Sequence, residues 1–244
     1  FAIYDILVYK CLIYKKIIIF TGNCTKYGYR CGLSKLLPYL FRQKTMLYAI
    51  LKKTSLYFMT LTEIINHHRN TYINQLIPFY ENRSNGAKEI LLKLNSEEET
   101  LLFNLTRPDF LSNNDGNYNI EELYPETFSN HQPINFLYKN LNIELHPIFW
   151  HGVEFILDTK FVELEWLKTW TTKALKEDND ETTNELDLLE AIHNVSVPNI
   201  SEKSTIFAVD FGSSTSETFF SLLDCINETG TKSVIINSSD LIEE

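Results

Sequence analysis

The composition of the chain changes abruptly at Met59, and this change limits what the chain can fold into. Residues 1–58 contain ten Lys or Arg residues and one acid, Asp5, so their formal charge is +9. Residues 59–244 contain twelve basic and thirty-one acidic residues, which gives −19. All three tryptophans and all six histidines lie in this second part. Two segments that differ so strongly rarely share one cooperative core.

We therefore expect residues 1–58 to lie outside the fold, as a translated leader that precedes a protein starting at Met59. Lys10, Lys15 and Lys16 interrupt the apolar residues, which leaves no stretch of about twenty that could span a membrane and no unbroken block typical of a secretory signal. A basic, aromatic arm that binds a membrane surface or nucleic acid is the alternative.

The four cysteines indicate a reducing compartment. Cys11, Cys24 and Cys31 lack the spacing of a zinc site, and Cys225 stands alone in the acidic part. Free thiols and no disulfide framework are typical of a cytoplasmic protein. We therefore expect a cytoplasmic location.

The segment 59–107 is predicted to be helical. Thr60-Leu-Thr-Glu63 has the capping-box pattern of a helix start, and apolar residues then recur at helical spacing, so we expect a helix over 61–80. A shorter helix over 87–94 and another running through 101–105 should follow. Residues 108–133 show no period and contain three prolines, which predicts a loop or boundary.

The segment 134–244 is predicted to be α+β and to pack with 59–107 as one acidic domain. His151-Gly152 should join strands 142–150 and 153–157 in a hairpin, followed by a helix over 161–176 whose tryptophans we expect in the core rather than in a ligand-stacking surface. Strands over 188–197 and 205–211, a helix opened by Ser214-Thr-Ser-Glu217 and stopped at Gly230, and strand 233–237 complete the order ββα-ββαβ. This order predicts an antiparallel or mixed sheet with helices on one face.

The sharpest local motif is Phe207-Ala-Val-Asp-Phe-Gly-Ser-Ser-Thr-Ser216. It resembles the first phosphate-binding loop of the actin/Hsp70-like ATPase superfamily over about ten residues, although the apolar residues that follow have helical spacing and not the strand of that superfamily. The resemblance implies a phosphate or nucleotide site at Asp210, Gly212, Ser213 and Ser214. Free N–H groups at a helix start also favour anions, whereas Asp210 and Glu217 oppose them. A strand, a turn and a capped helix are the simpler interpretation.

No pattern of residues predicts catalysis, a metal or a cofactor. His67 and His68 are adjacent and diverge on a helix, and His146 and His151 fall on opposite faces of a strand. No zinc-type histidine spacing and no nucleophile motif occur. We therefore expect a protein that is not an enzyme, has no cofactor and binds no metal.

The charge of the acidic part favours contact with a basic protein partner. A charge of −19 over residues 59–244 repels nucleic acid and anionic membranes and attracts basic proteins. In size, acidity and lack of motifs, this part is similar to bacterial toxin-neutralising immunity proteins as a class. We expect a small protein-binding or inhibitory module that uses Glu177, Asp178, Asp180 and Glu181. The alternative is a domain that binds a phosphorylated ligand or nucleotide through Asp210–Glu217.

Overall fold

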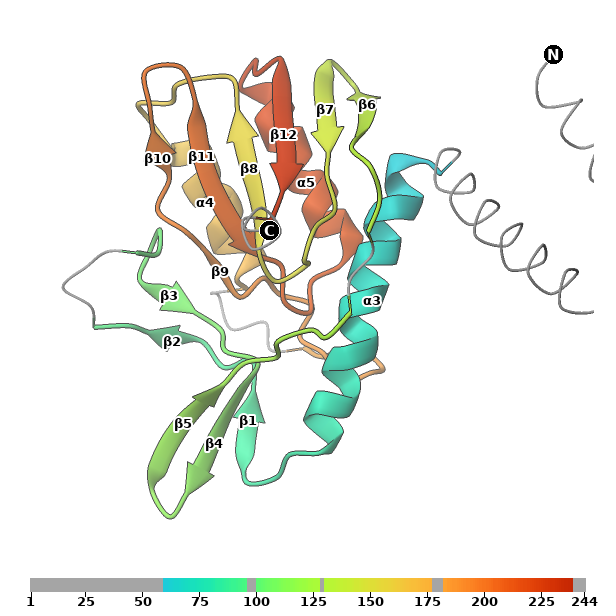
Figure 1. Ribbon diagram of the computed structural model, residues 1–244. Helices are drawn as coiled ribbons and strands as arrows, with labels where there is room; N and C mark the ends of the chain where they lie inside the picture. The colour runs from blue at the N-terminus through green and yellow to red at the C-terminus, as the bar shows by residue number, and fades with distance from the viewer. Residues whose placement is uncertain (1–58, 96–99, 128–129, 177–181, 239–244) are drawn as a thin grey trace, which may run out of the picture. The chain divides into compact units, whose positions relative to one another are not determined.

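The computed structural model describes residues 59–95, 100–127, 130–176 and 182–238, and every structural statement below concerns these residues. They form the predicted α+β fold, in which a helical start precedes the sheet region (Figure 1). The basic segment 1–58 lies outside the described residues.

The first helix, α3 (Leu61–Glu81), begins as predicted. The Glu63 backbone N–H donates to the Thr60 hydroxyl at 3.2 Å, and the Thr60 N–H donates to the Glu63 carboxylate at 2.7 Å. This reciprocal cap satisfies N–H groups that the helix leaves unpaired. The buried face of α3 includes Ile64, Ile65 and Leu76, each with 0% exposure.

The largest sheet is mixed and contains seven strands. They are β6 (Ile134–Tyr138), β7 (Leu141–Leu145), β8 (Val153–Leu157), β9 (Asn194–Val195), β10 (Asn199–Ile200), β11 (Thr205–Asp210) and β12 (Ser233–Asn237). Their order is β10-β11-β8-β12-β7-β6, and β9 also pairs with β11. Only the pairing of β12 with β7 is parallel.

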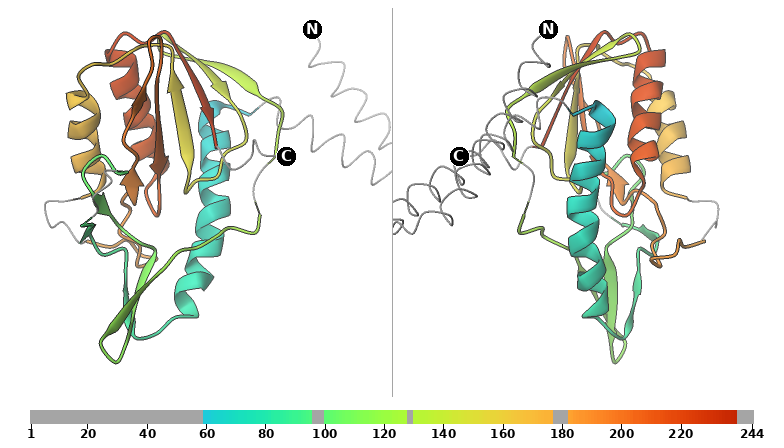
Figure 2. Two further views of the ribbon diagram at one scale, coloured as in Figure 1. Left: turned by 60° about the vertical axis from the view of Figure 1, so that its left-hand side comes forward. Right: turned by 90° about the vertical axis from the view of Figure 1, so that its right-hand side faces the viewer.

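Helices α4 (Glu165–Ala174) and α5 (Ser216–Glu228) lie side by side on one face of this sheet (Figure 2). Phe155 on β8 and Phe207 on β11 stack with ring centroids 5.4 Å apart, and Phe219 of α5 packs on Phe155. Burying each such side chain stabilises the fold by about 1.5–3 kcal/mol. Helix α5 ends as predicted before Gly230, whose φ is +85°.

Two smaller sheets extend away from the large one (Figure 1). The first contains β1 (Gly86–Lys88), β4 (Phe110–Asn114) and β5 (Asn117–Glu121), in the order β1-β4-β5. The second pairs β2 (Leu92–Lys93) with β3 (Leu105–Thr106). Asp115 and Gly116 join β4 to β5 with φ angles of 52° and 88°, the left-handed pair required by a tight two-residue hairpin turn.

Two helix predictions in the N-terminal part are wrong. The segment 87–94 contains β1 and β2, and 101–105 is a turn that leads into β3. Glu89 has a φ of +48°, which interrupts any helix there. Leu101 forms an isolated antiparallel β-bridge with Ser196, the residue that follows β9 of the seven-stranded sheet. Pairing with distant strands therefore overrides the local helical spacing.

The strand predictions also need correction. β7 and β8 do not form a hairpin at His151-Gly152, because β12 lies between them. The sequence prediction missed β6, which pairs with β7 instead. Residues 108–133, expected to be a loop, contain the β4–β5 hairpin. The strand expected over 188–197 is limited to β9.

Candidate functional site

The four residues predicted to bind a ligand lie together where β11 leads into α5. The Asp210 carboxylate accepts a hydrogen bond from the Gly212 N–H at 2.9 Å. Gly212 has a φ of +46°, and a Cβ there would lie 2.1 Å from the His193 ring. The predicted strand, turn and helix are thus present, and the turn requires glycine.

The two serines of this turn face the interior. Ser213 and Ser214 have 0% exposure. The Ser213 hydroxyl accepts from the Glu190 N–H at 2.9 Å, and Arg69 Nε donates to the Ser214 carbonyl at 2.7 Å. Thr215, and not Ser214, is the N-cap of α5, and its side chain makes no capping bond. A phosphate site at this turn stays a prediction, and binding there would require the turn to open.

The four acids predicted to contact a partner, Glu177, Asp178, Asp180 and Glu181, lie outside the described residues. Their role stays a prediction.

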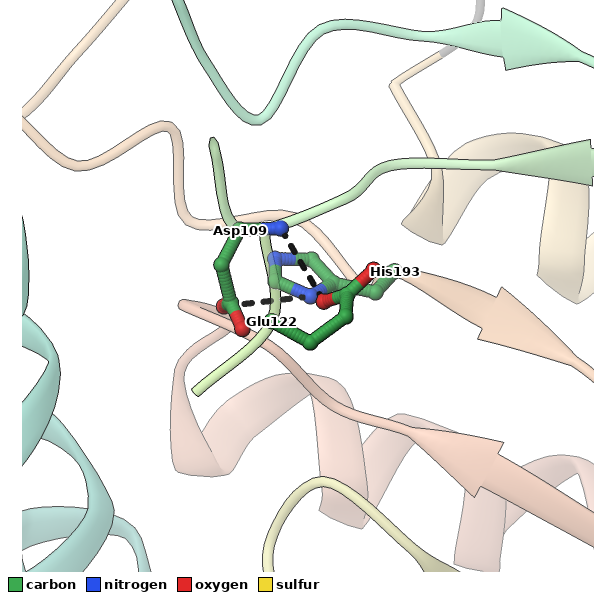
Figure 3. Close-up of side chains that lie close together, drawn as sticks. All are labelled: Asp109, Glu122 and His193. Atoms are coloured by element: carbon green, nitrogen blue, oxygen red, sulfur yellow. Dashed lines mark hydrogen bonds and ion pairs between the residues drawn. The ribbon is translucent and has the colours of Figure 1, made fainter. Parts of the chain in front are cut away.

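Sequence reasoning missed a buried cluster of carboxylates around His193. His193 Nε2 lies 3.1 Å from Glu89 Oε1, and Nδ1 lies 3.6 Å from Asp109 Oδ1 and 3.7 Å from Asp210 Oδ2. The side chains of His193, Glu89 and Asp109 are 1–3% exposed. Figure 3 shows Glu122 turned toward the same imidazole.

These side chains come from the ends of strands that belong to different sheets. Glu89 follows β1, Asp109 precedes β4 and Glu122 follows β5, whereas His193 precedes β9 and Asp210 ends β11. Glu89 and His193 are 104 residues apart, so no local spacing reveals the cluster. It joins the three-stranded sheet to the seven-stranded sheet.

Further hydrogen bonds fix the carboxylates of the cluster. Tyr72 donates to Asp109 Oδ1 at 2.8 Å, and the Leu123 N–H donates to Oδ2 at 2.7 Å. The Leu189 N–H donates to Glu89 Oε2 at 3.0 Å. Each buried acid is thus held in one orientation by an element outside its own strand.

Burial and mutual repulsion shift the protonation of the cluster. Burial opposes a charged imidazole, yet Asp210, Glu89 and Asp109 together raise the pKa of His193 well above its usual value. Burial also raises the pKa of Asp109. Burial of its carboxyl group and the nearby Asp109 charge raise the pKa of Glu122 to about 7. By contrast, burial of Glu89 is outweighed by its hydrogen bond and charge interaction with His193, so the pKa of Glu89 is lowered. Asp109 and Glu122 are therefore the carboxyl groups whose negative charge the surroundings accommodate least.

The β4–β5 hairpin exposes apolar side chains beside acidic ones. On β5, Tyr118 is 65% and Ile120 is 51% exposed, and Tyr124 just beyond is 81% exposed. Tyr118 and Ile120 are two residues apart and so share one face of the strand. Within 108–138 the sequence has five acids and no Lys or Arg.

No protein-family model, curated protein or solved structure matches the chain. Function must therefore be inferred from its own geometry.

A groove of about 740 Å³ lies between α4 and α5. Its lining includes Trp166, Trp170 and Cys225, with Glu165, Glu228 and Lys173 also present. Of the two helix tryptophans expected in the core, Trp170 is buried at 5% exposure and Trp166 is only partly buried. Trp150 is also buried, at 2% exposure. The mixed charges give the groove no preference for an acidic or basic ligand.

Within the described residues, the helices are too short or too polar to cross a membrane.

Proposed function

We propose that the chain is a protein-binding or inhibitory module for a basic protein partner, and that the β4–β5 hairpin is its contact surface. The observation that carries this proposal is the exposure of Tyr118 and Ile120 on β5, a strand at the edge of its sheet. This surface lies in the segment 108–138, which has five acids and no Lys or Arg.

Each feature of the hairpin contributes a different part of binding. An edge strand offers unpaired N–H and C=O groups to an added strand. Tyrosine is enriched among the residues that dominate binding energy. Surrounding acids attract a basic partner and repel an acidic one. Because Arg83 pairs with Glu121 at 2.8 Å and Glu122 belongs to the His193 cluster, the attraction rests mainly on Asp115 and Glu126.

The proposed setting is the cytoplasm. Cys225 is a free thiol in the described part of the chain, which fits a reducing compartment. Repulsion by the acidic surface argues against nucleic acid and anionic membrane as partners.

A displayed library of random peptides tests the proposal with the full chain as bait. We expect the enriched peptides to carry net positive charge and to bind more weakly as salt rises. The double variant Tyr118→Ser/Ile120→Ser should bind them at least about tenfold more weakly.

Leu137→Ser is the matched control, because Leu137 is 72% exposed on β6, at the edge of the other sheet. It should leave peptide binding unchanged. Enrichment of neutral or acidic peptides, or equal binding by the hairpin double variant, would contradict the proposal.

A further inference from the structure

The hydrogen bonding of His193 leaves one ring nitrogen directed at carboxylates. Nε2 lies 3.1 Å from Glu89 Oε1, and because an ionised carboxylate can only accept, Nε2 is the donor of that pair. Nδ1 is fully buried and has no hydrogen-bond partner within the described residues. A carboxylate that holds one imidazole nitrogen in this way is the usual support of a metal-binding histidine.

The distances around Nδ1 fit a shared ion better than hydrogen bonds. Asp109 and Asp210 oxygens lie 3.6 Å and 3.7 Å from it, beyond the 2.7–3.2 Å typical of hydrogen bonds. Two ligands bound about 2.1 Å from one ion at a tetrahedral angle lie about 3.4 Å apart. The separation between Nδ1 and these two oxygens is therefore close to the separation of two ligand atoms on one ion.

Glu122 supplies a third ligand atom to the same place. One ligand atom each of Asp109, Glu122 and His193 lies within 4.8 Å of the other two. Figure 3 shows the three side chains converging. Asp109 is already oriented by Tyr72 and by the Leu123 N–H, as metal-binding carboxylates usually are.

The charge of the cluster also calls for a cation. Four carboxylates, those of Glu89, Asp109, Glu122 and Asp210, surround one imidazole, which carries at most one positive charge. The nearest further cation among the described residues is the buried guanidinium of Arg107, which donates to the Glu89 backbone carbonyl at 2.6 Å. Buried carboxylates are costly unless opposite charge offsets them. With the imidazole neutral, as metal binding requires, a divalent ion would reduce the formal charge of the four carboxylates and the imidazole from −4 to −2.

We propose that His193, Asp109 and Glu122 bind one divalent transition-metal ion, with Asp210 at its border. One imidazole nitrogen with carboxylate oxygens suits Zn²⁺ or Mn²⁺ better than Mg²⁺ or Ca²⁺, which prefer oxygen alone. Glu122 is exposed, so it gives the ion a path from solvent.

The ion would connect the two sheets. Asp109 and Glu122 flank the two paired ends of the β4–β5 hairpin, where Phe110 faces Glu121, and His193 precedes β9. Binding therefore fastens the base of the hairpin to the seven-stranded sheet.

Calorimetry on the full chain, after removal of metal with a chelator, tests the site. Zn²⁺, Mn²⁺ and Mg²⁺ are titrated separately. We expect one saturable site per chain for Zn²⁺ or Mn²⁺, a higher melting temperature on binding, and slower amide exchange in β4 and β5. No saturable site for either ion, or several weak and equal sites, would overturn the proposal in favour of a buried imidazolium.

Glu122→Gln tests the ligand assignment at a residue that is exposed as a whole, although its carboxyl group turns into the cluster. It should weaken binding at least about tenfold, and the metal-free variant should fold because the change removes repulsion from Asp109. Glu126→Gln is the control, since it removes one exposed acid from the same segment and should leave affinity unchanged. Equal affinity of Glu122→Gln and wild type would overturn the assignment. If the metal proposal failed, the proposed partner binding would be unaffected, because Tyr118 and Ile120 do not bind the ion.

Discussion

At the scale of single residues, buried histidines make the stability of this protein depend on pH. His68 is 3% exposed, and its Nε2 lies 3.2 Å from Nε2 of His131. Burial, followed by the nearby His131 and His67, lowers the pKa of His68 to about 3. The unfolded chain therefore binds more protons than the folded one as the pH falls below about 6.5.

Acidification from pH 7 to pH 5 should thus cost about 2 kcal/mol of unfolding free energy through His68 alone. Denaturant unfolding at the two pH values measures this cost. In His68→Gln the loss between pH 7 and pH 5 should be smaller by about this amount. An equal loss in the variant and wild type would show that His68 is not buried in its neutral form.

Gly212 is the second residue with a sharp consequence. A Cβ at Gly212 would lie 2.1 Å from the His193 ring, and its φ of +46° disfavours other residues. Gly212→Ala should destabilise the fold by about 3 kcal/mol, from overpacking together with left-handed strain. Gly152→Ala is the control, because no atom lies within 4 Å of the added Cβ. Thermal melting of both variants measures the difference. Equal melting midpoints would contradict the close contact between Gly212 and the His193 ring.

At the scale of elements, the sequence predicted those helix ends and strands that depend on residues close by in the chain. The capping box at Thr60, the stop at Gly230 and the strands β8, β11 and β12 were all predictable because their determinants lie within a few residues. The Asp115-Gly116 turn carried an equally local signal, which the sequence reading overlooked. β1, β2 and β3 could not be predicted, because their pairing partners lie elsewhere in the chain.

The candidate site was predictable only in part, for the same reason. The turn at Asp210 and Gly212 was visible in the sequence. Its contact with His193, and through it with Glu89 and Asp109, joins segments up to 104 residues apart. Glu89 falls in a segment with helical spacing and Asp109 in one without any period, so nothing local indicates that both are buried.

The packing of α4 gives a prediction at this scale. Trp170 is 5% exposed, and its Nε1 donates to the Ser221 hydroxyl at 2.8 Å. Trp170→Ala should therefore cost about 3–5 kcal/mol of unfolding free energy. Trp166→Ala should cost less, because Trp166 is only partly buried at the groove. Denaturant unfolding compares the two, and the reverse order would contradict the position of α4.

At the scale of the whole molecule, the change in composition at Met59 predicts where the cooperative fold begins. Among the described residues, Leu61 is the first that is buried. A chain of residues 59–244 should fold cooperatively and melt at the midpoint of the full chain. Differential scanning calorimetry measures both. Failure of the shorter chain to fold would show that residues 1–58 contribute to the core.

The central claim is that the β4–β5 hairpin, together with the acids of its segment, binds a basic protein partner. Its most direct test is the association rate of a selected basic peptide with the full chain at about 50 mM and about 500 mM salt, measured by stopped flow. We predict a rate that falls steeply with salt in wild type and in Leu137→Ser, and at least about tenfold weaker binding by Tyr118→Ser/Ile120→Ser. A rate insensitive to salt, with full binding by the double variant, would contradict the claim. Saturable binding of ATP in place of the peptide, lost in Asp210→Asn, would move the function to the β11–α5 turn.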